Sequence, residues 1–186
     1  MLLALGSPLL MDWMVVRKDR LWIETKPKPD VLVLRDVGRR IRALADASGD
    51  DTPYLLTQDA YLAVESGLPL PRGLEMGPFS YFPHLSNEDA KRHRVHNEAT
   101  VLRMIRSPYA PVLAATSGYA FAIDCPTAGR VPEAERRRLL DEIAFFYEPV
   151  GTVPDFGQAH TELTLWRRKS LGREPDTGRV GTGGAP

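Results

Sequence analysis

Residues 52–83 read TPYLLTQDAYLAVESGLPLPRGLEMGPFSYFP, and this stretch decides the fold. Leu55 and Leu56 form a short apolar run after Pro53, and such a run predicts a strand that is buried on both faces. Signals for a helix follow at once. A strand that leads directly into a helix is the beginning of an α/β unit, so we expect a layered α/β domain.

The helix after this strand has a start signal and a stop signal. Thr57 or Asp59 is placed to accept hydrogen bonds from the first free backbone N–H groups, and Gly67 is placed to end the helix in the left-handed conformation. The helix is therefore expected to run through Glu65. Its small apolar residues predict the face that packs on the sheet: Ala60, Ala63 and Val64.

The remainder of the stretch, residues 68–83, holds too many prolines and glycines for a regular element. It is nevertheless rich in large apolar side chains, and we expect Phe79, Tyr81 and Phe82 to be buried. Two interpretations remain open. The segment is either a hydrophobic loop that covers the edge of the sheet, or a lid or docking loop that faces another domain.

Composition limits the protein class. The chain of 186 residues is long enough for one domain with a substantial core, and its 43% hydrophobic and 26% charged content is that of a soluble globular protein. Lys plus Arg and Asp plus Glu both number 24, so charge does not indicate a nucleic-acid partner. The single cysteine excludes an internal disulfide.

Three regions are predicted: an apolar N-terminal arm and linker (1–29), the α/β domain (30–168) and a disordered polar tail (169–186). Residues 1–16 are apolar, but a bilayer span needs roughly 20 such residues. Two interpretations of this segment stand side by side. It is the end of a membrane helix or its connector, or it is an arm that packs on the domain.

Periodicity predicts the other elements. The domain is expected to be a small layered one with a mainly parallel central sheet, an antiparallel C-terminal hairpin and helices packed on it. Three further helices are expected: one that begins at Asp30, one over residues 86–106, and one from Pro132 to Glu148. The buried stripe expected for the first is Val31, Leu34, Val37, Ile41 and Leu44. The expected strands are 112–116, 118–123, 150–153 and 161–168.

No motif by itself specifies a reaction. His93 and His96 lie three apart on the expected 86–106 helix, but no third ligand accompanies them, so exposed imidazoles are the preferred interpretation and no metal is predicted. Among the carboxylates, Asp59, Glu65 and Glu75 lie in the central stretch. Paired carboxylates perform glycosidic chemistry, whereas surface or capping roles are the more ordinary assignment. No phosphate loop or dinucleotide fingerprint occurs, so no cofactor is predicted.

Three segments together carry a resemblance: LLTQDAYLAVESGLPLPRGLEMGPFSYFP (55–83), GYAFAI (118–123) and FGQAHTELTLW (156–166). Over residues 30–168 the chain resembles the soluble C-terminal part of bacterial polytopic glycosyltransferases of family 39, the dolichyl- or polyprenyl-phosphate mannosyltransferase type. In such enzymes the catalytic carboxylate and the lipid-linked donor belong to the membrane part. The resemblance therefore implies a domain that is not catalytic alone and carries over no catalytic residue.

The resemblance also implies partners and a location. The partner would be the membrane core of the enzyme, or the bilayer reached through the N-terminal arm, on the extracytoplasmic face. A polyprenyl-phosphate sugar would be bound only by the complete enzyme. The matching loop positions taken as candidate binding residues are Asp59, Glu65, Glu75 and Tyr81.

Two other functions compete with this one. A free-standing small-molecule binding module would use residues 68–83 as its lid and would have a pocket beneath them. An independent hydrolase or transferase would require carboxylates or histidines to converge.

Overall fold

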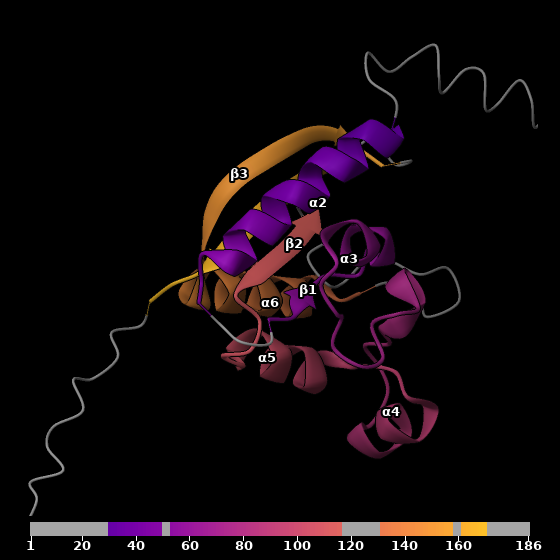
Figure 1. Ribbon diagram of the computed structural model, residues 1–186. Helices are drawn as coiled ribbons and strands as arrows, with labels where there is room; N and C mark the ends of the chain where they lie inside the picture. Colours follow the sequence, from indigo (N-terminus) through magenta and orange to yellow (C-terminus); the bar gives the residue numbers. More distant parts are fainter. Residues whose placement is uncertain (1–29, 50–52, 117–130, 158–160, 171–186) are drawn as a thin grey trace, which may run out of the picture.

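The computed structural model describes residues 30–49, 53–116, 131–157 and 161–170, which form one layered α/β domain (Figure 1). Within the described residues the order of helices and strands is the expected one, except that two helices replace the one expected over 86–106. In chain order they are α2 (Asp30–Asp46), β1 (Leu55–Leu56), α3 (Ala60–Ser66), the 3-10 helix η1 (Gly77–Ser80), α4 (Asn87–His93), α5 (Glu98–Arg106), β2 (Val112–Thr116), α6 (Glu133–Phe146), β3 (Tyr147–Phe156) and β4 (Thr161–Arg168).

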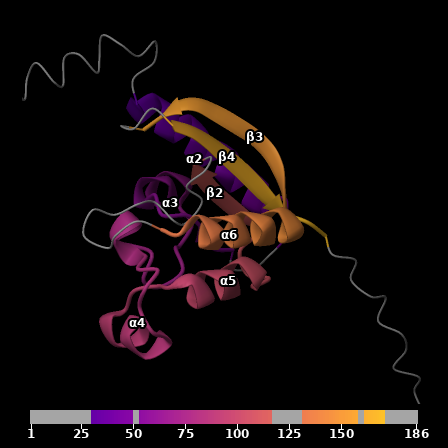
Figure 2. The same ribbon diagram turned by 180° about the vertical axis from the view of Figure 1, so that it is seen from behind.

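The sheet lies between two helical layers. Figures 1 and 2 show α2 and α3 on one face, with α5 and α6 on the other. Alternate residues of each strand serve the two layers: Leu55 belongs to the core beneath α2 and α3, whereas Leu56 belongs to the core beneath α5 and α6. In β2, Val112 and Leu113 divide in the same way. Burial on both faces explains why these strands are continuously apolar.

The strand order is β1-β2-β4-β3. β1 pairs with β2 in parallel, while the β2–β4 and β3–β4 pairs are antiparallel. The α/β class and the C-terminal hairpin are thus confirmed. The parallel part is smaller than expected, because among the described strands it consists of β1 and β2 only. The strand expected at 118–123 lies outside the described residues.

The start and end of α3 are as predicted. The Asp59 side chain accepts a hydrogen bond from the N–H of Tyr61, and Gly67 ends the helix with φ of 65°. Ala63 is buried as predicted and Ala60 is half-buried, but the assignment of Val64 to the buried face was wrong, since Val64 is 77% exposed and Leu62 and Ser66 are buried. The buried face of α3 differs from the predicted one because the helix packs on α2 as well as on the sheet. This contact is close: a Cβ at Gly38 would lie 2.7 Å from the Cβ of Glu65.

The single helix expected over 86–106 is wrong. The chain forms α4, leaves the helix at Arg94 in the left-handed conformation, and starts α5 after Asn97. Between the helices the N–H of His96 donates to the carbonyl of Ser80 (2.7 Å), and its carbonyl accepts from the N–H of Phe82 (2.8 Å). A capping box between Asn97 and Thr100 then begins the second helix. The two imidazoles consequently do not share a helix.

The aromatic residues of the central stretch are only partly buried. Tyr81 is 1% exposed, as expected, but Phe79 is 54% exposed and Phe82 is half-buried. The expected burial of Phe79 is therefore wrong. The tight Gly77–Ser80 turn directs Ser80 and Tyr81 inward and leaves Phe79 at the surface.

The N-terminal arm, residues 1–29, lies outside the described residues, as does the tail beyond residue 170. None of the helices that the structure describes is long and apolar enough to cross a membrane.

Candidate functional site

A cavity of about 780 Å³ opens at the end of the sheet where β1 and β2 finish. Its floor contains Ala114 and Ala115 of β2 and Leu163 of β4. Val33 and Leu34 of α2 form part of its wall. In open α/β sheets, ligands bind outside the carboxyl ends of parallel strands, which is where this cavity lies.

The polar side of the cavity comes from the three residues that follow β1: Thr57, Gln58 and Asp59. These three residues connect the end of β1 directly to the start of α3, so the strand and the helix fix their positions. The N–H of Asp59 donates to the Thr57 hydroxyl (3.1 Å), and the Asp59 carboxylate accepts from the N–H of Tyr61 (3.0 Å). Burial raises the pKa of Asp59, and the backbone donors of α3 oppose that rise.

Gln58 is the unusual member of this group. It is 5% exposed, and within the described part of the chain neither Nε2 nor Oε1 of its side chain has a hydrogen-bond partner. The η1 turn passes directly above it, since a Cβ at Gly77 would lie 3.0 Å from the Gln58 carbonyl oxygen. Both amide atoms are enclosed by the protein, and a buried polar group without a partner costs free energy.

The opposite wall is the loop 75–79, which includes Glu75, Met76 and Phe79. The Glu75 carboxylate accepts a hydrogen bond from the N–H of Gly73 (2.6 Å), which fixes it in a local turn. A pocket beneath residues 68–83 is what the small-molecule interpretation of the sequence required, and the structure contains one.

The structure brings together two of the four candidate residues. Asp59 and Glu75 both line the cavity, whereas Glu65 and Tyr81 are absent from its lining. Glu65 is exposed on α3, beside Gly38 of α2.

Tyr81 belongs to the other core, where its hydroxyl donates a hydrogen bond to the carboxylate of Glu135 on α6. Both side chains are buried. Burial, followed by this hydrogen bond, raises the pKa of Tyr81 well above its ordinary value, and burial also raises the pKa of Glu135. The pair fastens the end of the central stretch to α6 and therefore has a structural role.

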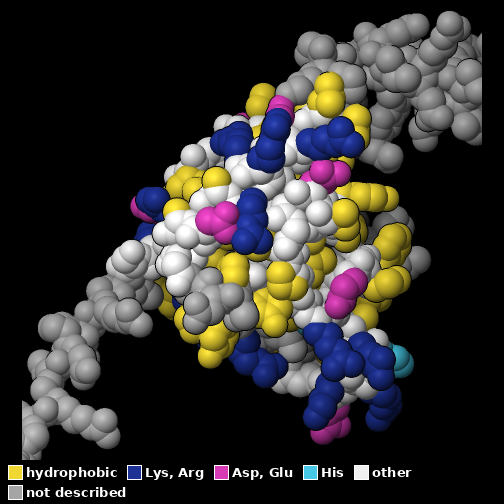
Figure 3. Space-filling model, viewed as in Figure 1, with side chains coloured by type: hydrophobic (Ala, Val, Ile, Leu, Met, Phe, Trp, Pro, Cys, Tyr) yellow, Lys and Arg dark blue, Asp and Glu magenta, His cyan; other side chains and the backbone are white. Residues whose placement is uncertain are grey.

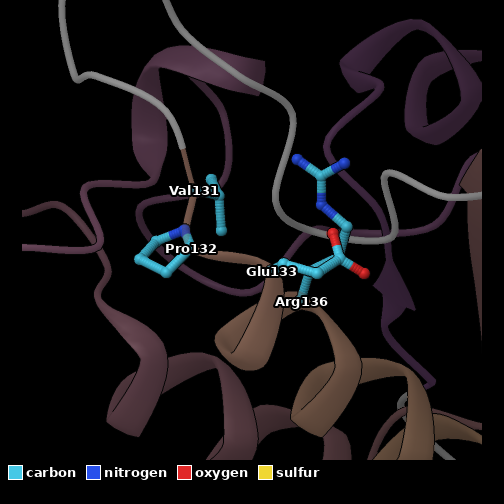
Figure 4. A pocket seen from close by; sticks show the side chains of 4 residues that line it. All are labelled: Val131, Pro132, Glu133 and Arg136. Carbon is cyan, nitrogen blue, oxygen red and sulfur yellow. The ribbon is translucent and has the colours of Figure 1, made fainter.

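A smaller hollow of about 350 Å³ lies at the beginning of α6 (Figure 4). Glu133 and Arg136 reach it from the first turn of the helix, and Val131 and Pro132 from the chain that leads into it. Arg136 already has an interaction within the protein.

The mouth of the larger cavity is apolar. The exposed residues around it and on the adjoining surface of α3 are Tyr61 (73%), Val64 (77%), Met76 (66%) and Phe79 (54%). Hydrophobic side chains gather over α3 and η1 in Figure 3, with a cluster of Lys and Arg over α4 below them. We call the four exposed side chains the apolar rim.

Comparisons with family models, curated proteins and solved structures found no match. Function must therefore be argued from the site. In the described part of the chain, no group of three or more His, Cys, Asp or Glu side chains is arranged to hold a metal ion. His93 is exposed on α4, whereas His96 is buried in the extended segment that follows it.

Three lining residues were not predicted as site residues from the sequence: Gln58, Ala114 and Leu34. Gln58 belongs to no motif, but it directly follows a strand of an α/β unit, and that position was the available signal. The other two residues read as ordinary core positions. They line one cavity because α2, which contains Leu34, lies beside the end of β2, which contains Ala114.

Proposed function

We propose that this domain binds a small organic molecule in the cavity at the carboxyl ends of β1 and β2. The observation that carries the proposal is a roomy, mostly apolar cavity at this end of the sheet, with two carboxylate side chains, Asp59 and Glu75, in its lining. Natural ligand sites have this composition: apolar walls and a few fixed polar groups that set orientation.

Binding of a neutral aromatic probe tests the proposal. Indole is titrated into the full-length chain and followed by protein NMR, with Ala60→Trp as the blocking variant, because Ala60 lines the cavity and is half-buried. The matched control is Val64→Trp, on the same helix but outside the lining. Indole should bind the wild type and the control and lose at least tenfold in affinity for the blocking variant. Equal binding to all three proteins would contradict the proposal.

A second candidate is the one that the family resemblance implies: a soluble domain that docks on the membrane core of a polyprenyl-phosphate glycosyltransferase. The apolar rim favours it, because exposed apolar patches often mark interaction sites. This function predicts membrane or partner association in which the rim or residues 1–16 take part.

Liposome flotation tests the second candidate. The full chain is compared with a variant that carries serine at Tyr61, Val64, Met76 and Phe79, and with a variant that lacks residues 1–16. Flotation of the wild type and its loss in either variant would support docking. If the folded wild-type protein stays in solution and does not float with the liposomes, docking on lipid is contradicted.

A further inference from the structure

The apolar surface around the large cavity extends beyond the apolar rim. The first turn of α2 adds Val31, which is 51% exposed, and Leu32, which is 42% exposed. Val31 was expected on the buried stripe of this helix, and that prediction is wrong. The cavity connects this turn with the rim, because Val33 and Leu34 line it from the same turn. Exposed apolar surface of this kind often marks a place where another segment or molecule binds.

The sequence contains an apolar segment that suits such a surface. Residues 1–16 read MLLALGSPLLMDWMVV, and Asp12 is their only charged side chain. The segment is too short to cross a bilayer, which takes roughly 20 apolar residues. Its side chains gain free energy when a protein surface removes them from water. The segment and the cavity therefore match in polarity.

The connection between them places the segment within reach of the cavity. Residues 17–29 join it to Asp30, where α2 begins. Val33, which lines the cavity, lies only about 5 Å further along the helix axis. The connecting residues span at most about 45 Å when fully extended, so the segment can reach the cavity of its own domain. A short tether also keeps a segment at a millimolar effective concentration, so that even weak affinity fills the site.

Charge favours the same occupant. The cavity lining includes the half-buried Asp59 and the exposed Glu75, and it contains no Lys, Arg or His. Three cations follow the apolar segment directly: Arg17, Lys18 and Arg20. When the segment enters the cavity, these cations come close to the two carboxylates, and opposite charges attract. An anionic lipid headgroup would instead meet charges of its own sign at this place.

We propose that residues 1–16 bind in the large cavity of their own chain and cover the apolar rim. This inference rests on the proposed function, because it makes the segment an internal competitor of the small molecule for the same cavity. A ligand then has to displace the segment before it binds. A segment that fills the cavity in about nine of ten molecules lowers the apparent affinity for a ligand about tenfold.

A nitroxide label on the segment tests its location in the full-length chain. The label is attached to Ser7→Cys in a Cys125→Ser background, and broadening of backbone amide signals is measured by NMR. We expect the amide signal of Phe79 to broaden and that of Ala144, on α6, to stay sharp. Adding Ala60→Trp, which blocks the cavity, should restore the Phe79 signal. A sharp Phe79 signal without the blocking variant, or broadening that the blocking variant does not change, would overturn the inference.

Two other occupants of the rim give different results. In a mixture of labelled protein with unlabelled, ¹⁵N-enriched protein, broadening of the Phe79 signal would show that the segment binds a second copy, and the inference would be wrong. Wild-type flotation on liposomes that is lost without residues 1–16 would assign the segment to lipid and would also overturn it.

Indole titration distinguishes failure of this inference from failure of the proposed function. Deletion of residues 1–16 should raise the affinity for indole about tenfold, whereas deletion of residues 171–186, the matched control, should leave it unchanged. Trp13→Ser in the full-length chain should also raise the affinity, and it serves if the deletion variant does not fold. If indole binds the wild type and the variants equally, the segment does not fill the cavity, and the binding function stands. If the label locates the segment at Phe79 but indole binds none of the proteins, the binding function fails and the location of the segment stands.

Discussion

Replacing Gly38 by alanine is expected to destabilise the domain, although alanine is the better helix former. Gly38 lies within α2, where the change would ordinarily contribute about 1 kcal/mol to stability. A Cβ at this position would lie 2.7 Å from the Cβ, 2.8 Å from the carbonyl carbon and 2.9 Å from the carbonyl oxygen of Glu65. Two of these atoms are backbone atoms of α3, so they give way only if the helices move apart. Overpacking of this kind costs about 1–3 kcal/mol, and the net loss should be about 1–2 kcal/mol.

Urea unfolding of the wild type and Gly38→Ala measures this loss, with linear extrapolation to water. The matched control is Ala43→Gly in the same helix, at an exposed position where propensity alone applies. The control should lose about 1 kcal/mol. If Gly38→Ala instead gains about as much as the control loses, the close approach of α2 and α3 is refuted, together with the wall that α2 contributes to the cavity.

Two further predictions concern the buried side chains of Tyr81 and His96. Tyr81→Phe should lower the free energy of unfolding in urea by about 1–3 kcal/mol, because it leaves the buried Glu135 carboxyl without its hydroxyl donor. Phe79→Ala, at an exposed aromatic residue, should lower it by less than about 1 kcal/mol. Equal losses for the two variants would contradict this difference in burial. Burial lowers the pKa of His96 below its ordinary value of 6.5, although a backbone hydrogen bond of Arg72 and the charge of Glu75 act in the opposite direction. The stability that neutral His96 contributes is therefore fully present above pH 6.5, and it is lost as the pH falls toward the lower folded-state pKa. His96→Gln should flatten that part of the stability–pH profile, and a profile parallel to that of the wild type would exclude His96 as its source.

Local signals were enough to predict much of the fold. The strand at residues 55–56, the Asp59 cap, the Gly67 stop and the C-terminal hairpin all depend on neighbours in the chain, and all are present. The break between α4 and α5 depends on pairing of His96 with the distant Ser80–Phe82 segment, which periodicity does not reveal. The Asn97 capping box was a local signal that the apolar periodicity of the surrounding residues concealed.

The candidate site was less predictable, because its residues come from five separate parts of the chain, the β3–β4 hairpin being one of them. Asp59 and Glu75 could be selected as carboxylates of the central stretch, but the sequence could not show that both face one cavity. The exposure of Val64 illustrates the same limit: a small apolar side chain on a short helix is assigned to the wrong face when the position of a second helix is unknown.

Several features that lower stability lie at this cavity. A buried amide without a described partner, exposed aromatic and methionine side chains, and a tight turn held by Gly77 at φ of 60° each reduce stability where they occur. Outside the lining, the buried Tyr81 hydroxyl is paired with Glu135, whereas the buried Nε2 of His96 has no hydrogen-bond partner in the described part of the chain. Proteins depart from locally consistent choices mainly at functional sites, because selection there acts on binding as well as on stability. For that reason the apolar rim at the mouth adds to the evidence for a ligand site that the volume of the cavity provides.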